Sequence, residues 1–231
     1  MDVRLNKAIS MLGICSRRAA DKLILSNKIY VNGSLITNLG QKISEGSKIN
    51  ICDNEFIFKL HKKRMIWKYY KPVGLITSHN DEKGRPTVFD FLKQKIKGHI
   101  ISVGRLDLNS EGLLLITNDS EFARYAENPK NKLKRVYLVR AFGNLSEQIL
   151  NKIRIGVSID KINYAPIEIK ILRETSGKNH WFECTLYEGK NREIRKIFSH
   201  FGLSVNKLVR TQYGHFKLDN MKPNEIRLDG S

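Results

Sequence analysis

The residues of this chain that could perform chemistry are concentrated in one segment, which reads Gly-Arg-Leu-Asp-Leu-Asn-Ser-Glu-Gly-Leu-Leu-Leu from position 104. Asp107 lies in a turn between Gly104 and Gly112, directly before an apolar run. We expect this carboxylate to leave the core at the end of a strand, where the scaffold can aim it. A pair such as Arg105 and Asp107 is also typical of a surface salt bridge or an Asx turn. The flanking glycines and the apolar strand favour a functional site.

The overall charge indicates the kind of substrate. The chain has 231 residues with 41 Lys and Arg against 23 Asp and Glu, which gives a net charge of +18. An excess of this size is typical of proteins that bind phosphates and release counterions, whereas a solvated basic surface without a partner is the alternative. With 41% hydrophobic residues the chain can form a folded core. One carboxylate aimed from a cationic protein indicates chemistry on a polyanion.

Several classes of protein are disfavoured. No apolar run reaches the roughly 18 residues of a membrane span, and residues 1–5 lack the apolar stretch of a signal peptide. Cys15, Cys52 and Cys184 are too few and too far apart for a disulfide framework. The histidines have no zinc-like spacing beside a cysteine. We therefore expect a cytoplasmic protein with no metal and no membrane association.

Residues 1–60 are predicted to form a small separate domain of two helices followed by a sheet. Apolar residues recur at helical spacing over 4–12, and Ser16 is placed to cap a second helix. Strands are predicted over 28–31, 35–37 and 48–51, and Asn32-Gly33 is a strong hairpin signal. Residues 61–64, His-Lys-Lys-Arg, are interpreted as a linker, with a charged strand end as the alternative.

Residues 65–231 are predicted to form a larger α+β domain with a largely antiparallel mixed sheet flanked by helices. Alternating patterns predict strands, and helical spacing with capping residues at Thr87 and Asp119 predicts helices between them. The predicted strands cover 66–70, 100–103, 112–117, 133–142, 159–172, 181–187 and 208–213. The predicted helices cover 88–92, 120–126, 146–153 and 193–201.

Basic residues occur where anions could bind. Arg17 and Arg18 begin the second predicted helix, where cations oppose the helix dipole unless a phosphate docks there. Lys22 lies one turn further along the same helix. Arg192 and Arg195 similarly belong to the first turns of the helix over 193–201. In each case exposed arginines on a solvated helix face are the alternative interpretation.

Tyr137 lies among basic residues in the predicted strand Lys-Arg-Val-Tyr-Leu-Val-Arg from position 134. An aromatic ring among cations can stack on an unpaired base. A strand tyrosine is also a common core residue, so the pattern alone leaves both roles open.

Together these segments resemble the RsuA/RluB family of ribosomal RNA pseudouridine synthases over nearly the whole chain. Residues 2–60 resemble an S4 RNA-binding domain, through Arg-Leu-Asn-Lys from position 4, residues 13–24 and Val-Asn-Gly from position 31. Residues 65–231 resemble the catalytic domain, and the 104–115 motif matches at each family-defining position. Residues 118–129, 135–143 and 212–214 are most similar to the large-subunit synthase B type.

The resemblance implies a role for each site residue. Asp107 would be the catalytic aspartate, Tyr137 would stack on the target base and Arg195 would pair with the aspartate. Arg105 and Arg192 would contact RNA, while Arg17, Arg18 and Lys22 would grip phosphates. Glu193 departs from the glutamine that usually follows in the motif.

The implied reaction detaches uracil from C1′ of a flipped-out uridine and rejoins it through C5, without a cofactor. An ionised Asp107 would either attack C1′ or take the C2′ proton, and the sequence leaves both routes open. The expected partner is ribosomal RNA, from the large subunit, or a pre-ribosomal particle, and the expected state is a monomer. The alternative is a non-catalytic S4-type rRNA-binding protein or ribosome assembly factor.

Overall fold

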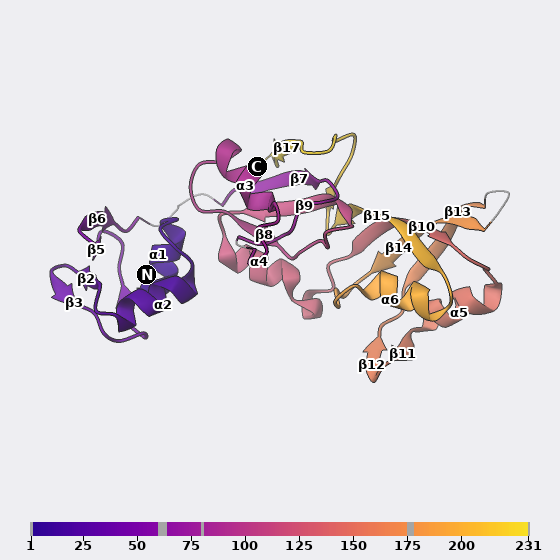
Figure 1. Cartoon of the computed structure of the whole chain (residues 1–231), viewed down its shortest axis with the longest axis horizontal. Helices are drawn as coiled ribbons and strands as arrows, with labels where there is room; N and C mark the ends of the chain where they lie inside the picture. Colours follow the sequence, from indigo (N-terminus) through magenta and orange to yellow (C-terminus); the bar gives the residue numbers. More distant parts are fainter. Residues whose placement is uncertain (1, 60–63, 80, 175–177, 231) are drawn as a thin grey trace. The chain divides into compact units, whose positions relative to one another are not determined.

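The structure is a computed structural model that describes residues 2–59, 64–79, 81–174 and 178–230 (Figure 1). The chain divides into two compact units, residues 1–64 with 96–100, and residues 65–95 with 101–231. Most of the predicted linker, residues 61–63, lies outside the described residues. The domain limits of 1–60 and 65–231 therefore stay a prediction. The grouping of residues 96–100 with the first unit was not anticipated.

The first unit combines two helices with a small sheet, in the predicted order. Ser16 caps the second helix, because its Oγ accepts the Ala19 N–H at 3.2 Å. Asn32 and Gly33 both have positive φ and form the predicted hairpin turn. The elements are β1 (Val3–Arg4), α1 (Leu5–Met11), α2 (Arg17–Leu25), β2 (Ile29–Val31), β3 (Ser34–Leu35), β4 (Lys42–Ile43), β5 (Lys48–Ile51) and β6 (Asn54–Ile57).

The apolar faces of both helices meet the inner face of this sheet. Ile9 from α1, Ile24 from α2 and Ile49 from β5 are completely buried in the common core. The sheet order is β3-β2-β5-β6, all antiparallel, and β1 pairs separately with β4. Sequence patterning found the helices but missed β4 and β6, since such short strands hold too few residues for alternation to be recognised.

The second unit is built on a nine-stranded sheet that is antiparallel except where β15 runs parallel to β9. This confirms the predicted mixed, largely antiparallel sheet. Along the sheet the order is β13-β14-β10-β15-β9-β7-β17, with β16 on β15 and β8 on β9. The strands are β7 (Ile66–Lys71), β8 (Ile101–Val103), β9 (Glu111–Thr117), β10 (Arg135–Phe142), β13 (Glu168–Glu174), β14 (Asn179–Leu186), β15 (Ser204–Tyr213), β16 (Phe216–Lys217) and β17 (Ile226–Leu228).

The helices of the second unit begin where capping residues predict. Thr87 Oγ1 accepts the Asp90 N–H at 3.2 Å at the start of α3, and Asp119 accepts N–H groups at the start of α4. Ile197 and Phe198 of α6 pack into the core beside β10 and β14, together with residues of α5. The helices are α3 (Val88–Lys95), α4 (Ser120–Glu127), α5 (Glu147–Ile155) and α6 (Glu193–His200), with a 3₁₀ turn over Pro129–Asn131.

The single strand predicted over 159–172 is wrong. This segment contains part of the hairpin β11 (Val157–Ile159) and β12 (Ile162–Tyr164), followed by the separate strand β13. The hairpin turns at Asp160 and Lys161, whose φ angles are 49° and 64°. Two-residue hairpin turns with positive φ usually carry Asn-Gly or Asp-Gly, so an Asp-Lys turn gave no recognisable signal.

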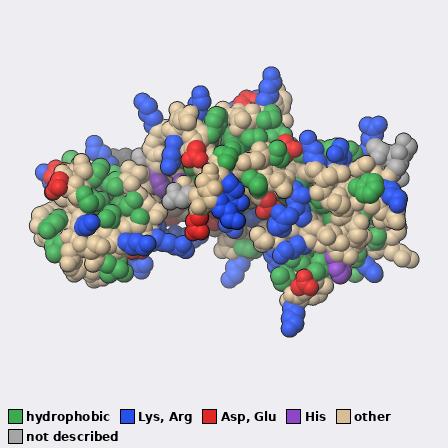
Figure 2. Space-filling model, viewed as in Figure 1, with side chains coloured by type: hydrophobic (Ala, Val, Ile, Leu, Met, Phe, Trp, Pro, Cys, Tyr) green, Lys and Arg blue, Asp and Glu red, His purple; other side chains and the backbone are tan. Residues whose placement is uncertain are grey.

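The surface is rich in basic side chains, as the net charge of the sequence indicates. On the face drawn in Figure 2, Lys and Arg side chains are spread over both units and Asp and Glu side chains are fewer. No helix in the described part of the chain is long and apolar enough to cross a membrane.

Candidate active site

The turn that carries Asp107 joins β8 to β9 and is held by hydrogen bonds to its own backbone. Thr77 Oγ1 donates to the Leu106 carbonyl at 2.9 Å and accepts the Leu106 N–H at 3.3 Å. The Ser110 N–H donates to the Asp107 carbonyl at 3.1 Å. The Asp107 side chain is 30% exposed. The backbone is therefore fixed while the carboxylate stays accessible to a substrate.

Lys71, the last residue of β7, supports the same turn from inside the protein. Its side chain is completely buried. Its ammonium donates to the carbonyls of Pro72, Asp107 and Ser110 at 3.0, 3.0 and 2.8 Å, which uses all of its hydrogens. Burial lowers the pKa of Lys71 to about 8, although the carboxylates of Asp107 and Glu111 oppose that shift.

A second buried cation lies where β9 meets β15. Gly112 pairs in parallel with Arg210, and a Cβ on Gly112 would come within 2.4 Å of the Arg210 carbonyl oxygen. Only glycine permits this approach, which brings the two strands together at the foot of the Asp107 turn. The Arg210 side chain is buried, and its Nε donates to the Leu113 carbonyl at 2.8 Å.

Tyr213, Arg135 and Arg210 form a buried cluster beside this contact. The Tyr213 hydroxyl donates to the Ala126 carbonyl at 2.8 Å and accepts from Arg135 at 3.0 Å. The guanidinium groups of Arg135 and Arg210 lie 4.8 and 4.9 Å from the centre of the tyrosine ring. Such cation–π contacts hold both charges without a carboxylate partner.

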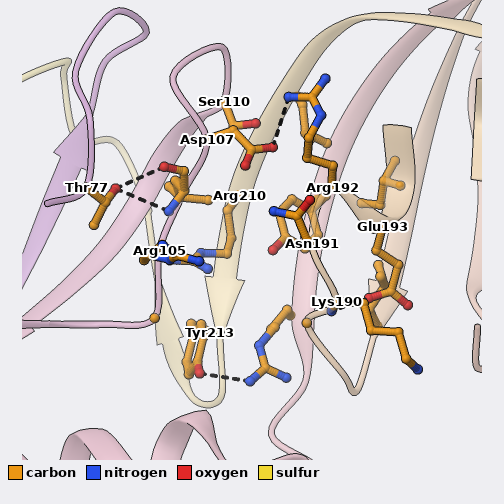
Figure 3. Close-up of a pocket in the computed structure, with 18 of the residues that line it drawn as sticks. Thr77, Arg105, Asp107, Ser110, Lys190, Asn191, Arg192, Glu193, Arg210 and Tyr213 are labelled. Atoms are coloured by element: carbon orange, nitrogen blue, oxygen red, sulfur yellow. Dashed lines mark hydrogen bonds and ion pairs between the residues drawn. The ribbon is translucent and has the colours of Figure 1, made fainter. Parts of the chain in front are cut away.

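These residues line one pocket of about 880 Å³, shown in Figure 3. Asp107 points into it from one side, and the segment from Lys190 to Glu193 faces it from the other. Arg105 also lines the pocket and is exposed. The space exceeds what one flat nucleobase needs, and its walls are both apolar and cationic.

Arg192 is the cation that faces Asp107. Its Nη1 lies 3.7 Å from Asp107 Oδ2, and its side chain is 47% exposed. Arg192 precedes α6 in a left-handed conformation with φ 53° and ψ 33°, which turns the chain into the helix. A non-glycine residue in this conformation needs support from its surroundings.

Arg195 takes a different position from the one the resemblance implies. Its Nη1 donates to the Val205 carbonyl at 2.9 Å and its Nη2 to the Asn109 carbonyl at 2.7 Å. Burial lowers the pKa of Arg195, as does the charge of Arg192. In the described part of the chain the ion pair with Asp107 belongs to Arg192 instead. Arg195 thus braces the Asp107 turn through the backbone of Asn109.

Tyr137 is a half-buried residue of β10 that lies between the pocket and the core. It lines the pocket and also packs against the core below α6. The structure therefore brings Asp107, Tyr137, Arg105 and Arg192 to one cavity, while Arg195 acts from behind it.

Sequence analysis missed the buried cations, although the signal for one of them was present. Trp67, Tyr69 and Lys71 alternate along β7, and all three are on its buried face. A lysine at a core position of a strand must have polar partners, which marks it for attention. No comparable signal reveals Arg135 or Arg210, because each stands among other basic residues.

The comparisons with known proteins agree with this geometry. Residues 66–200 match the family described as RNA pseudouridylate synthase, and residues 3–49 match the S4 domain. The chain belongs to the RNA pseudouridylate synthase family. As a member of that family it is an RNA pseudouridine synthase, an isomerase that acts on uridine in RNA. This is the enzymatic alternative of the two that the sequence left open.

Relatives of this pseudouridine synthase cover nearly its whole length. An uncharacterized RNA pseudouridine synthase from Rickettsia bellii is 52% identical over 97% of this chain and 95% of that protein. Ribosomal large subunit pseudouridine synthase B from Bacillus subtilis is 34% identical over 97% of this chain and 91% of that protein. A crystal structure of a pseudouridylate synthase superposes with a TM-score of 0.69 at 25% identity, covering 99% of this chain and 96% of that one.

The S4 domain of this pseudouridine synthase carries the remaining predicted RNA contacts. Arg17, Arg18 and Lys22 are all exposed on α2. Arg17 donates to the Asn6 side chain at 3.4 Å, and Asn6 donates to Asp21 at 2.8 Å. The exposed cations at the start of this helix are available to an anion.

Proposed function

We propose that this pseudouridine synthase converts a specific uridine of 23S ribosomal RNA, with Asp107 as the catalytic carboxylate. The observation that supports this role of Asp107 is that its carboxylate oxygens accept few contacts from the protein. Among the described residues, no hydrogen bond from the protein reaches this carboxylate, and its ion pair with Arg192 is 3.7 Å long. By contrast, Glu127 in the same pocket already accepts the Gly104 N–H at 2.7 Å. Asp107 is therefore free to engage a substrate.

The reaction must break the C1′–N1 bond, form a C1′–C5 bond and move one proton from C5 to N1. The target uridine leaves its stack to enter the pocket, because C1′ is not reachable inside a helix. Asp107 then either attacks C1′ as a nucleophile or removes the C2′ proton, and both routes require its ionised form. Arg192 supplies the positive charge that faces this carboxylate.

Tyr137 supports the detached uracil by stacking while the base turns to present C5. Arg195, together with Lys71, holds the backbone of the Asp107 turn so that the carboxylate does not move with the base. Arg105 lies at the exposed part of the pocket, where it contacts the RNA rather than the reacting atoms.

The decisive experiment replaces Asp107 by Asn. Asp107→Asn should reduce pseudouridine formation at least about 10³-fold while RNA affinity stays within about threefold, because the amide keeps the shape but cannot attack or accept the proton. Product is measured by mass spectrometry of RNA fragments. The exposed Asp219, which pairs with Lys68 on the surface, provides the control variant Asp219→Asn. Full turnover by Asp107→Asn would remove Asp107 from the mechanism.

The assignment to 23S RNA rests on relatives named ribosomal large subunit pseudouridine synthase B, such as the one from Bacillus subtilis. We further propose that the enzyme acts as a monomer in the cytoplasm, on 23S RNA or a pre-ribosomal particle. Pseudouridine mapping in ribosomal RNA from cells with and without this protein tests the substrate. One modification lost from 23S RNA is expected, and a loss confined to 16S RNA would contradict the assignment.

The S4 domain is proposed to supply affinity by neutralising phosphates with Arg17, Arg18 and Lys22. Changing these three residues to Gln should weaken RNA binding. The slope of the logarithm of the binding constant against the logarithm of the salt concentration should become shallower by about 0.7–0.9 for each phosphate that is no longer neutralised. The control is Lys48→Gln, since Lys48 already faces Glu55 at 3.5 Å. An unchanged affinity and slope for the triple variant would count against this role.

A further inference from the structure

The wall of the pocket opposite Asp107 contains an acidic pair, one buried and one partly exposed glutamate, that the reaction itself does not use. Glu193, the first residue of α6, is only 4% exposed, and its Oε2 accepts the Lys190 N–H at 2.9 Å. Glu188 accepts the Ala165 N–H at 2.8 Å and pairs with the Lys190 ammonium. After its burial, a side-chain hydrogen bond with Glu188 is the next cause that raises the pKa of Glu193.

Two carboxyl groups can share a hydrogen bond only if one of them carries a proton. Glu193 Oε1 is buried and has no donor within the described residues, so an ionised Glu193 would leave this oxygen unsatisfied. A proton on Oε1 removes the difficulty, because the oxygen then becomes a hydrogen-bond donor. The unsatisfied oxygen therefore favours the Glu193 side of the pair for the shared proton.

The electrostatic environment leads to the same assignment. Burial, and after it the hydrogen bond with Glu188, raises the pKa of Glu193 to about 8 from its usual 4.5. Burial alone would also raise the pKa of Glu188, but the Ala165 N–H, the Lys190 ammonium and the Glu193 proton together lower it. The pair thus carries one negative charge near neutral pH.

Among the described residues, Lys190 is the cation that pairs with this acidic pair, and the other nearby cations are bound elsewhere. Lys190 comes from the same turn and contacts Glu188, and its ammonium lies 5.8 Å from the ring centre of Tyr164 on β12. Arg135 on β10 and Arg210 on β15 line the same pocket, but both are bound to carbonyl oxygens and to Tyr213.

The pair closes the turn that presents Arg192 to Asp107. The Glu193 side chain reaches back to the N–H of Lys190, and Glu188 ties the start of the turn to residue 165. Arg192 stands between these anchors with φ 53°, a conformation that needs them. Loss of the shared proton would set two carboxylates against each other and open the turn.

We propose that Glu193 is a positioning residue that acts as a neutral hydrogen-bond donor to Glu188, and that this bond holds Arg192 against the catalytic carboxylate. The proposal rests on Asp107 being that carboxylate. A glutamine at this position would donate the same hydrogen bond through its amide without needing a proton. Glutamate makes the bond conditional on pH, since the donor is present below about pH 8 and lost above it.

The test compares the wild type with Glu193→Gln and Glu193→Ala on the same RNA, as kcat from pH 6.5 to 9. At pH 7 we expect Glu193→Gln to retain activity within about threefold and Glu193→Ala to lose at least about tenfold. The ratio of Glu193→Gln to wild-type activity should rise about tenfold between pH 7 and 9, as the wild type loses its donor. This ratio cancels ionisations that both proteins share, including those of Lys71 and of uracil.

A ratio that stays flat from pH 6.5 to 9, or a Glu193→Ala variant as active as the wild type, would overturn the proposal. Glu183→Gln, an exposed glutamate on β14, is the matched control and should leave the ratio flat. A carbon-13 NMR titration of the glutamate carboxyl groups gives a reading without turnover. It should show a resonance titrating near pH 8 in the wild type and in Asp107→Asn, but not in Glu193→Gln. Because this reading does not depend on turnover, it separates a failure of the Asp107 assignment from a failure of the Glu193 proposal.

Discussion

Replacing Lys71 by Met tests whether a buried cation holds the Asp107 turn. Met preserves most of the side-chain length but removes the three hydrogen bonds to the carbonyls of Pro72, Asp107 and Ser110. Hydrogen bonds from a charged donor contribute about 1.5–3 kcal/mol each, so their loss costs roughly 4.5–9 kcal/mol. Burying the charge opposes this: a pKa lowered from 10.5 to about 8 corresponds to roughly 3.4 kcal/mol. The net destabilisation is therefore about 1–6 kcal/mol, with about 3 expected.

The assay is urea unfolding followed by tryptophan fluorescence. Both tryptophans, Trp67 and Trp181, lie in the second unit, so the signal reports the unit that contains the turn. The control is Lys68→Met on the same strand, because Lys68 forms a partly exposed ion pair with Asp219 and such pairs contribute about 0–1 kcal/mol. Equal losses from the two variants would refute the argument that the buried ammonium holds the turn.

Catalysis should respond more sharply than stability. Release of the carbonyls of Asp107 and Ser110 allows the carboxylate to move, and a displacement of about 1 Å can cost roughly 10²-fold in rate. We expect the folded Lys71→Met protein to lose about 10–100-fold in kcat, whereas its RNA affinity stays within about threefold. A variant with normal kcat would show that the turn keeps its geometry without Lys71.

Three further outcomes follow from the same contacts. Arg192→Gln should lower kcat about 10-fold and change the free energy of unfolding by no more than about 0.5 kcal/mol, because the Arg192 side chain is 47% exposed. Arg195→Gln should also lower the free energy of unfolding in urea by about 1–3 kcal/mol, because it removes two hydrogen bonds to carbonyls. Equal stability losses from the two variants would contradict these different roles of Arg192 and Arg195. Gly112→Ala should destabilise the second unit by about 3 kcal/mol or more by the same measurement, because its Cβ would meet a backbone oxygen at 2.4 Å, and a neutral result would show that β9 and β15 can separate. In a thiol-reagent assay of the native protein, exposed Cys52 should react quickly and buried Cys184, whose pKa burial raises, only on unfolding; rapid labelling of both would contradict the core.

The elements that sequence analysis found share strong local signals. Ser16, Thr87 and Asp119 each cap the helix that they were expected to cap, because capping depends on residues within one turn. The 104–115 motif likewise placed Asp107 in a turn before a buried strand. Local chemistry was therefore sufficient to locate these helix starts and the Asp107 turn.

The features that sequence analysis missed depend on contacts distant in the chain, on an unusual turn or on burial. Arg195 reaches the carbonyl of Asn109, 86 positions earlier, and nothing near residue 195 indicates that partner. The hairpin over residues 157–164 was overlooked because its Asp-Lys turn lacks glycine. The raised pKa of Glu193 follows from its burial in the wall of the pocket beside Glu188, which the motif spacing does not show.

The cations around the pocket divide by burial into two groups with different tasks. Lys71, Arg135 and Arg210 are buried and bound to backbone carbonyls, so a substrate phosphate cannot displace them without unfolding the strand ends. Arg105 and Arg192 are exposed, and each can exchange its protein contacts for RNA contacts at little cost. Counting charges in the sequence cannot separate the groups, because both appear simply as basic residues. Under the proposed function, the buried cations hold the Asp107 turn from below, while the exposed cations stay accessible to the phosphates of RNA.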